Sequence, residues 1–245
     1  MDLTTIIGVA AAAGLVIAGF AGSQISASLL NMHGIVVVLG GTVVATLINT
    51  PLKYVSRAVS ELSIIFRERE EAHPERIIPV LVGLAEQARM RGLAALKETD
   101  PAVAGGFLNR AATAALEYND YKFVREVLEQ EINQSVDDMN EVANVYRTMG
   151  VMAPMFGLLG TLIGIIGVLK DLANPESVGP AMAVAITSAF YGIFFANMVC
   201  VPIAGKMRAK VWMEVRMKSM VLEGILEIMK GSVPLVVERR LQAYL

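Results

Sequence analysis

Four long runs of uncharged, mostly apolar residues dominate the pattern of hydrophobic and polar positions along the chain. They cover residues 3–21, 34–52, 149–169 and 178–204. A helix needs about 20 such residues to cross the hydrocarbon core of a membrane, so each run is long enough for one span. The pattern therefore predicts an all-α integral membrane protein with four transmembrane helices.

The segment between the second and third runs has the spacing of amphipathic helices. One apolar stripe recurs at intervals of three and four residues: Leu52, Val55, Val59, Leu62 and Phe66. It either lies on the membrane surface or packs on neighbouring helices. Pro74 is predicted to begin a further helix at its first turn, with four residues facing inward: Ile77, Ile78, Leu81 and Leu84.

Two of the spans are predicted to continue as helices beyond the membrane. Breaks are expected at Gly92, at Asp100 with Pro101 and near Gly105, but from Tyr121 no Gly or Pro interrupts the helical periodicity before residue 150. After the fourth run the periodicity persists until Gly231, a typical stop signal. Two such rods could carry a movement out of the membrane, although a plain helical hairpin has the same pattern.

The distribution of charge orients the spans. The segment 53–148 holds 12 Lys and Arg and the tail 205–245 holds 8, whereas the two loops between paired spans hold only Lys170. The positive-inside rule places the segment and the tail in the cytoplasm, with both termini inside. The predicted division is residues 1–52 (spans one and two), 53–148 (a cytoplasmic helical domain), 149–204 (spans three and four) and 205–245 (a cytoplasmic helical tail). The N-terminus has no basic region typical of a cleaved signal peptide.

Several classes of function find no support. The single cysteine, Cys200, excludes an internal disulfide, and His33 and His73 lie too far apart in sequence to indicate a metal site. No basic stripe interleaved with aromatic residues indicates nucleic-acid binding. No nucleophile–base pair, phosphate loop or metal cluster indicates an enzyme, and we expect no cofactor.

The four spans contain no Asp, Glu, Lys, Arg or His. Ionisable residues inside a span are the usual carriers of protons or ions, so any such group must come from a partner. Spans three and four instead offer small and hydroxyl-bearing residues, and Pro154, Gly157 and Thr161 share one helix face. That face is consistent with a lined passage and equally with close helix packing.

The order of motifs resembles the stator A subunits of flagellar motors, the MotA/PomA family. The segment APMFGLLGTLIG, the loop ending GPAMAVA and the later YG, AN and VP resemble the family's last two spans. LLNMHGIVVVLGGTVVATLI resembles its second span, ARMRGLAALKE its charged cytoplasmic motif and PLVVERRLQAYL its C-terminal end. The resemblance implies a bacterial inner-membrane homopentamer around two copies of a MotB/PomB-like B subunit, which supplies a membrane aspartate. Ion flow past that aspartate would turn the ring against the rotor's switch-complex protein.

The resemblance also implies roles for individual residues. Thr161 matches a threonine facing the ion site, and Ser188 with Ala189 falls where sodium-type members have a Thr-Thr pair, with Thr187 just before. The lost hydroxyl favours protons over sodium. Pro154 and Pro202 match two prolines at the cytoplasmic ends of the spans, where each would free the carbonyl four residues earlier.

The charged motif is the expected rotor contact. Arg89 matches the family's rotor-facing arginine and Arg91 adds a second charge. The family's glutamate aligns with Lys97, so either Glu98 takes the acidic role or that role is weakened. The alternatives to a stator are an ExbB/TolQ-type energiser of an envelope machine, a solute transporter and a passive scaffold. Two spans before the cytoplasmic segment argue against the first, and the absence of a repeat argues against a transporter.

Overall fold

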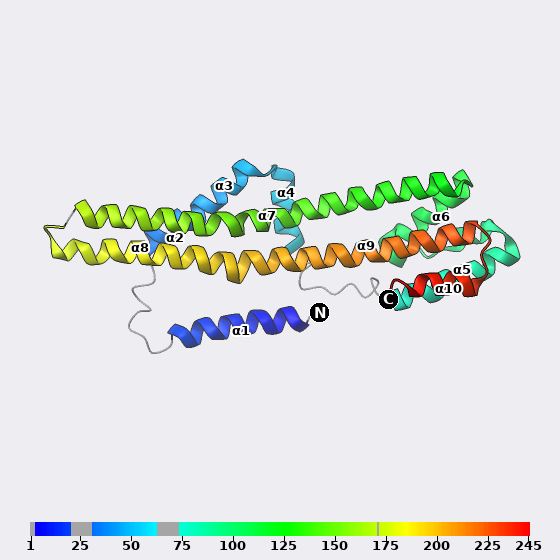
Figure 1. Cartoon of the computed structure of the whole chain (residues 1–245), viewed down its shortest axis with the longest axis horizontal. Coiled ribbons are helices and arrows are strands. Elements are labelled where there is room, and N and C mark those ends of the chain that lie inside the picture. Colours follow the sequence, from blue (N-terminus) through cyan, green and yellow to red (C-terminus); the bar gives the residue numbers. More distant parts are fainter. Residues whose placement is uncertain (1–2, 21–30, 63–73, 171) are drawn as a thin grey trace. The chain divides into compact units, whose positions relative to one another are not determined.

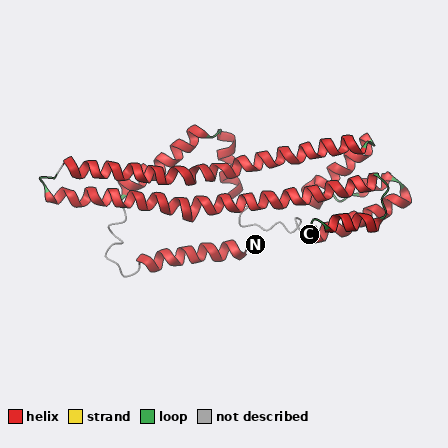
Figure 2. Cartoon of the chain, in the orientation of Figure 1, coloured by secondary structure: helices red, strands yellow, loops and turns green. Residues whose placement is uncertain are grey.

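A computed structural model describes residues 3–20, 31–62, 74–170 and 172–245, and every regular element in these residues is a helix (Figure 2). The chain divides into two compact units. Unit 1 comprises Met1–Glu68 and Asn140–Arg208, and unit 2 comprises Arg69–Met139 and Ala209–Leu245. The all-α prediction is confirmed.

Unit 1 contains the predicted spans. The first is α1 (Leu3–Phe20), and the second is built from α2 (Met32–Ile35), the π-helix η1 (Val36–Gly40) and α3 (Gly41–Asn49) (Figure 1). Within the described residues, three helical stretches are long and apolar enough to cross a membrane, namely Met32–Asn49 and parts of Tyr121–Lys170 and Glu176–Met229. The apolar stretch Leu3–Ala18 is shorter, so the four-span count stays a prediction.

The two predicted rods are present. Helix α7 (Tyr121–Lys170) runs without a break for 50 residues, with Pro154 inside it. The second rod joins α8 (Pro175–Phe195), the π-helix η6 (Ala196–Cys200) and α9 (Val201–Met229). It ends just before Gly231, whose φ of 74° is the left-handed conformation that favours glycine at a helix end. The predicted stop is therefore confirmed.

The turn before Pro202 is wider than an α-helical turn. In η6 the N–H of Val201 donates to the carbonyl of Ala196, five residues earlier. Proline has no N–H to donate and disturbs the turn that precedes it. A π-turn is one way in which a helix takes up such a disturbance. No π-turn accompanies Pro154, so the two prolines affect their helices differently.

Helix α4 (Leu52–Glu61) carries the first part of the predicted apolar stripe, for which a position on the membrane surface and packing on neighbouring helices were both open. Leu52 and Val59 are 72% and 70% exposed, so they do not form the packed face. Ala58 is buried instead, and the hydroxyl of Tyr146 donates to its carbonyl oxygen at 2.8 Å. Phe66 lies outside the described residues. Within the chain α4 thus packs through Ala58 and Leu62, and the membrane-surface position of the exposed Leu52 and Val59 stays a prediction.

Unit 2 has one hydrophobic core. It receives residues from α5 (Pro74–Arg91), the 3₁₀-helices η4 (Leu93–Glu98) and η5 (Val103–Gly106), α6 (Phe107–Tyr118), α10 (Pro234–Gln242) and the adjoining parts of α7 and α9. The four inward positions predicted for α5 are all buried: Ile77, Ile78, Leu81 and Leu84. Positive φ angles at Gly92, Gly105 and Gly106 mark breaks at predicted places. Helix α10 packs against α5.

Candidate ion pathway and rotor-facing surface

Glycines on α7 bring it into close contact with α8. A Cβ atom on Gly164 would lie 2.6 Å from the backbone nitrogen of Ala185, and one on Gly192 would lie 2.6 Å from the carbonyl oxygen of Ala153. A Cβ atom on Gly157 would lie 3.0 Å from the carbonyl oxygen of Ser188, and one on Gly160 would lie 2.4 Å from the Cβ of Ser188. Small residues permit this approach of two backbones in a membrane. Close packing therefore accounts for the glycines of the APMFGLLGTLIG motif.

The two hydroxyl groups predicted on span four are buried. Thr187 and Ser188 are 3% and 0% exposed, and each donates to a carbonyl one turn earlier, that of Ala183 or Val184, at 2.7 Å. A Cβ atom on Gly34 would lie 3.0 Å from Oγ of Ser188 and 3.2 Å from Oγ1 of Thr187. The hydroxyls thus lie where α2 and α8 meet. A hydroxyl that donates still has lone pairs with which to accept, so both oxygens bring acceptor capacity to this contact.

Thr161 occupies the face of α7 beside that contact. Its side chain is half-buried and donates to the carbonyl of Leu158 at 2.6 Å. The preceding residue, Gly160, packs on Ser188. Ala189 is half-buried, and its Cα lies 3.4 Å from a Cβ placed on Gly157. The structure therefore brings the Thr161 region and residues 187–189 to one helix–helix contact.

The two prolines lie in neighbouring parts of unit 1 but differ in exposure. Pro154 is half-buried on α7 and close to Gly192, since a Cβ atom placed on Gly192 would lie 3.1 Å from the Cα of Pro154. Pro202 is exposed on α9. A Cβ on Gly150 would meet Cys200 and Val201 at 3.4 Å, so the carbonyl that Pro154 frees lies near the π-turn before Pro202.

The charged motif forms an exposed corner of unit 2. Arg89 and Arg91 lie in the last turn of α5 and are both exposed. Nη1 of Arg91 lies 3.6 Å from Oε1 of Glu98, and both side chains are 65% exposed. Such exposed pairs contribute only about 0–1 kcal/mol. The arrangement leaves these charges available to a partner, and Lys97 is exposed beside them.

Comparison with known proteins identifies the family. The profile of the MotA/TolQ/ExbB proton channel family matches residues 100–220. Motility protein A of Bacillus subtilis is 30% identical over 250 residues, which cover 100% of this chain and 91% of the relative. The chain belongs to the MotA/TolQ/ExbB proton channel family.

Two solved structures of this family are similar over the full length. The flagellar MotAB stator complex from Bacillus subtilis has 29% sequence identity to this chain and a TM-score of 0.90. The structure of C. jejuni MotAB has 26% sequence identity and a TM-score of 0.89. Each match covers 100% of this chain and 96% of the chain in the solved structure.

Two features of this MotA-family chain escaped the sequence analysis. Thr42 and Thr46 on span two are 0% and 3% exposed and donate to the carbonyls of Val38 and Thr42 at 2.6 and 2.7 Å. Their spacing of four within an uncharged run was the available signal. The hydroxyl of Tyr191 accepts from the N–H of Asn31 at 3.1 Å, which ties the start of span two to α8. Only the folded chain brings those two residues together.

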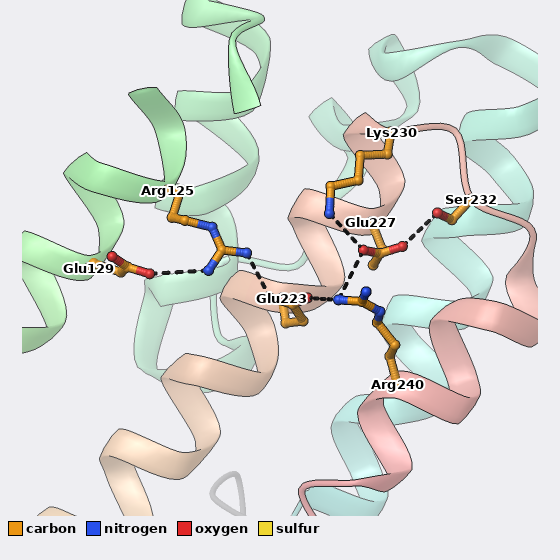
Figure 3. Close-up of polar contacts among 7 residues, drawn as sticks. All are labelled: Arg125, Glu129, Glu223, Glu227, Lys230, Ser232 and Arg240. Atoms are coloured by element: carbon orange, nitrogen blue, oxygen red, sulfur yellow. Dashed lines mark hydrogen bonds and ion pairs between the residues drawn. The ribbon is translucent and has the colours of Figure 1, made fainter. Parts of the chain in front are cut away.

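A polar cluster fixes the turn between α9 and α10 (Figure 3). Glu227 is 4% exposed, and its carboxylate accepts from Lys230 at 2.9 Å and from Ser232 at 2.6 Å and lies 3.4 Å from Arg240. Burial opposes the charged form, but the hydrogen bonds and the charges of Lys230 and Arg240 outweigh it and lower the pKa of Glu227. Glu223 binds Arg240 as well and pairs with Arg125 at 3.1 Å. Because α10 packs on α5, this cluster supports the helix that carries Arg89.

Proposed function

We propose that the chain is the A subunit of a bacterial flagellar stator. The subunits form a ring in the inner membrane, conduct ions down their gradient together with a B subunit and convert this flow into torque on the rotor. The observation that carries the proposal is the full-length likeness to MotAB stator complexes. The uncharged spans support it, because a chain without membrane carboxylates needs a partner to supply one.

The assembly we propose is a homopentamer around two copies of a MotB/PomB-like subunit. Both termini and residues 53–148 face the cytoplasm, in accord with the distribution of Lys and Arg. The likeness to complexes that contain MotB supports the choice of partner. An ExbB/TolQ-type role is disfavoured because this likeness extends over the two spans that precede the cytoplasmic segment.

In this assembly the ion passes beside the α7–α8 contact. Thr161 approaches the partner's carboxylate from the half-buried face of α7, next to residues 187–189. The backbone carbonyls disturbed by Pro154 and Pro202 lie toward the cytoplasmic exit, where freed carbonyls find water. Protons are the proposed ion, since Ala189 offers no hydroxyl to a sodium ion. Rotation reaches the rotor's switch-complex protein through Arg89, Arg91 and Glu98.

Ion flux measured in proteoliposomes tests whether the B subunit supplies the group that carries the ion. The chain alone should give no proton or sodium flux above background. The complex with its B subunit should conduct, and replacing the B subunit's membrane aspartate with asparagine should abolish conduction. Substantial flux through the chain alone contradicts the proposal. Swimming assays of a stator-deleted host, with and without sodium, then test torque and identify the ion.

A further inference from the structure

The outward side of α5 adjoins the charged motif of unit 2. The inward side of this helix packs on the core, where a Cβ atom on Gly224 of α9 would lie 2.8 Å from Cδ1 of Leu81. The opposite side carries five residues at intervals of three, four, three and four positions: Arg76, Pro79, Gly83, Glu86 and Met90. All but Gly83 are exposed. We call these five residues the α5 outer face. Their spacing is the one by which a helix contacts a single partner helix along its length.

Two residues of the α5 outer face are unfavourable in an exposed helix interior. Pro79 has no N–H to donate to the carbonyl of Glu75, and glycine loses more conformational freedom on folding than any other residue. Nothing within the described chain requires the glycine, because its backbone is helical and a Cβ atom on Gly83 would have no neighbour within 4 Å. Residues that break a local preference without a gain in the fold are expected at functional sites.

The glycine lies where a partner helix would approach most closely. Gly83 is seven residues from Arg76 and seven from Met90, so it is the centre of the α5 outer face. At about 1.5 Å per residue the face is roughly 21 Å long. The distance between two packed helices depends on the side chains at their contact. A partner that crosses at Gly83 can therefore lie close to the backbone of α5.

Met90 offers an apolar contact at the end of the face beside the charged motif. It is 77% exposed, and Arg89 and Arg91 lie about 100° to either side of it around the helix. Met and Arg are enriched in protein interfaces. Among the residues that the structure describes, Arg89 and Glu86 have no hydrogen-bond or ion-pair partner. An exposed methionine between two arginines favours a partner that carries an apolar side chain between carboxylates.

The charges distinguish the rotor from a second copy of this chain as the occupant. In a symmetric contact of two copies around Met90, the same patch lies on both sides, so arginines would face arginines. Like charges that meet across an interface destabilise it. The rotor protein has no such constraint, and the α5 outer face continues into Arg89 and Arg91, the proposed rotor contact. The rotor is therefore the favoured occupant.

We propose that the α5 outer face receives a helix of the rotor's switch-complex protein. The helix crosses α5 at Gly83 and packs an apolar side chain, flanked by carboxylates, on Met90. This inference rests on the proposed function and adds a steric and apolar contact to the charged one. Arg89 and Arg91 attract the acidic helix, and Gly83 and Met90 determine how closely it packs.

Substitutions that preserve the fold separate this contact from a structural role. In the complex with the B subunit, Gly83→Gln should leave the Tm unchanged or raise it, because the side chain enters open space and glutamine favours a helix more than glycine. It should still weaken binding of the purified switch-complex protein roughly tenfold, as loss of a central interface contact does. Met90→Gln should also weaken binding. The matched control is Met213→Gln, since Met213 is 51% exposed but lies on α9, and it should bind normally.

Salt dependence and ion flux complete the test. The loss in Gly83→Gln should persist at high salt because it is steric, whereas the loss in Arg89→Glu should shrink as the charges are screened. Ion flux through the complex should stay normal in Gly83→Gln and Met90→Gln while swimming falls. Normal binding and swimming of both, beside an impaired Arg89→Glu, overturns the α5 outer face and leaves the proposed function standing. Dissociation of the complex in Gly83→Gln assigns the face to a second copy and also overturns the proposal.

Discussion

The cluster around Glu227 allows a quantitative prediction about stability. In Glu227→Gln the side chain keeps its shape but loses the charge that Lys230, Ser232 and Arg240 bind. Hydrogen bonds to a charged group contribute about 1.5–3 kcal/mol. The partners Lys230 and Arg240 are 35% and 53% exposed and can return to water, so we expect a net loss of about 2 kcal/mol rather than the sum of three bonds.

The assay is thermal unfolding of the purified complex, followed by the fluorescence of Trp212. A loss of about 2 kcal/mol lowers the apparent Tm by roughly 4–8 °C in a chain of this size. The matched control is Glu238→Gln on α10, whose side chain accepts a long hydrogen bond from Gln242, at 3.3 Å. This control should shift the Tm by less than about 2 °C. Both variants are scanned at one rate because membrane complexes often unfold irreversibly.

The pH dependence provides an independent check. The folded pKa of Glu227 lies below its unfolded value, which is about 4.3 for glutamate. Its contribution is therefore fully present above pH ~4.3 and is lost as the pH falls through the folded pKa. The difference between wild type and Glu227→Gln should shrink in that acidic range. A Tm no lower than that of Glu238→Gln, or a difference that grows on acidification, would refute the reasoning.

Three further predictions concern the pathway, the packing and the rotor surface. Gly164→Ala should destabilise the complex by about 1–3 kcal/mol, because the new methyl group meets backbone atoms of α8 that cannot move aside. Size-exclusion chromatography should show loss of assembly. The control Gly179→Ala should assemble normally, because a Cβ atom there has no neighbour within 4 Å. Arg89→Glu should reduce swimming without changing the size of the complex, since exposed substitutions alter stability by less than about 0.5 kcal/mol; dissociation would show that the residue is structural. Thr161→Ala should lower ion flux more than assembly, and Pro154→Ala should leave flux poorly coupled to swimming; normal swimming of both assigns them to packing.

Helical periodicity made most of the fold accessible from the sequence. The inward positions of α5, the continuity of α7 and the stop at Gly231 all follow from local spacing and backbone preference. The packed face of α4 did not, because Ala58 is buried through a bond to Tyr146, 88 residues away. The π-turn before Pro202 could not be predicted either. A proline indicates that the preceding turn is disturbed, but it does not indicate how the helix accommodates the missing hydrogen bond.

Less of the candidate ion pathway than of the fold could be predicted from the sequence. Spacing alone placed Pro154, Gly157 and Thr161 on one face, but it left packing and passage equally open. The resemblance nominated residues 187–189, and the structure adds that two of their hydroxyls are already engaged with backbone carbonyls. The cluster of Glu227 escaped because its partners meet only once α10 folds back beside α9 (Figure 3).

The unequal treatment of the two prolines makes the two rods mechanically different. Helix α7 stays α-helical through Pro154, although the carbonyl of Gly150 loses its donor there, whereas the turn before Pro202 widens to a π-turn. A regular α-helix transmits a tilt along its length, while a π-turn is a point at which a helix can bend. About 33 residues separate Pro154 from Tyr121, a length of roughly 50 Å. A tilt of only about 5° at Pro154 would sweep the far end of α7 through roughly 4 Å. In the proposed stator, a small displacement of α7 beside the ion would therefore give its other end a stroke about as long as the spacing of two successive residues.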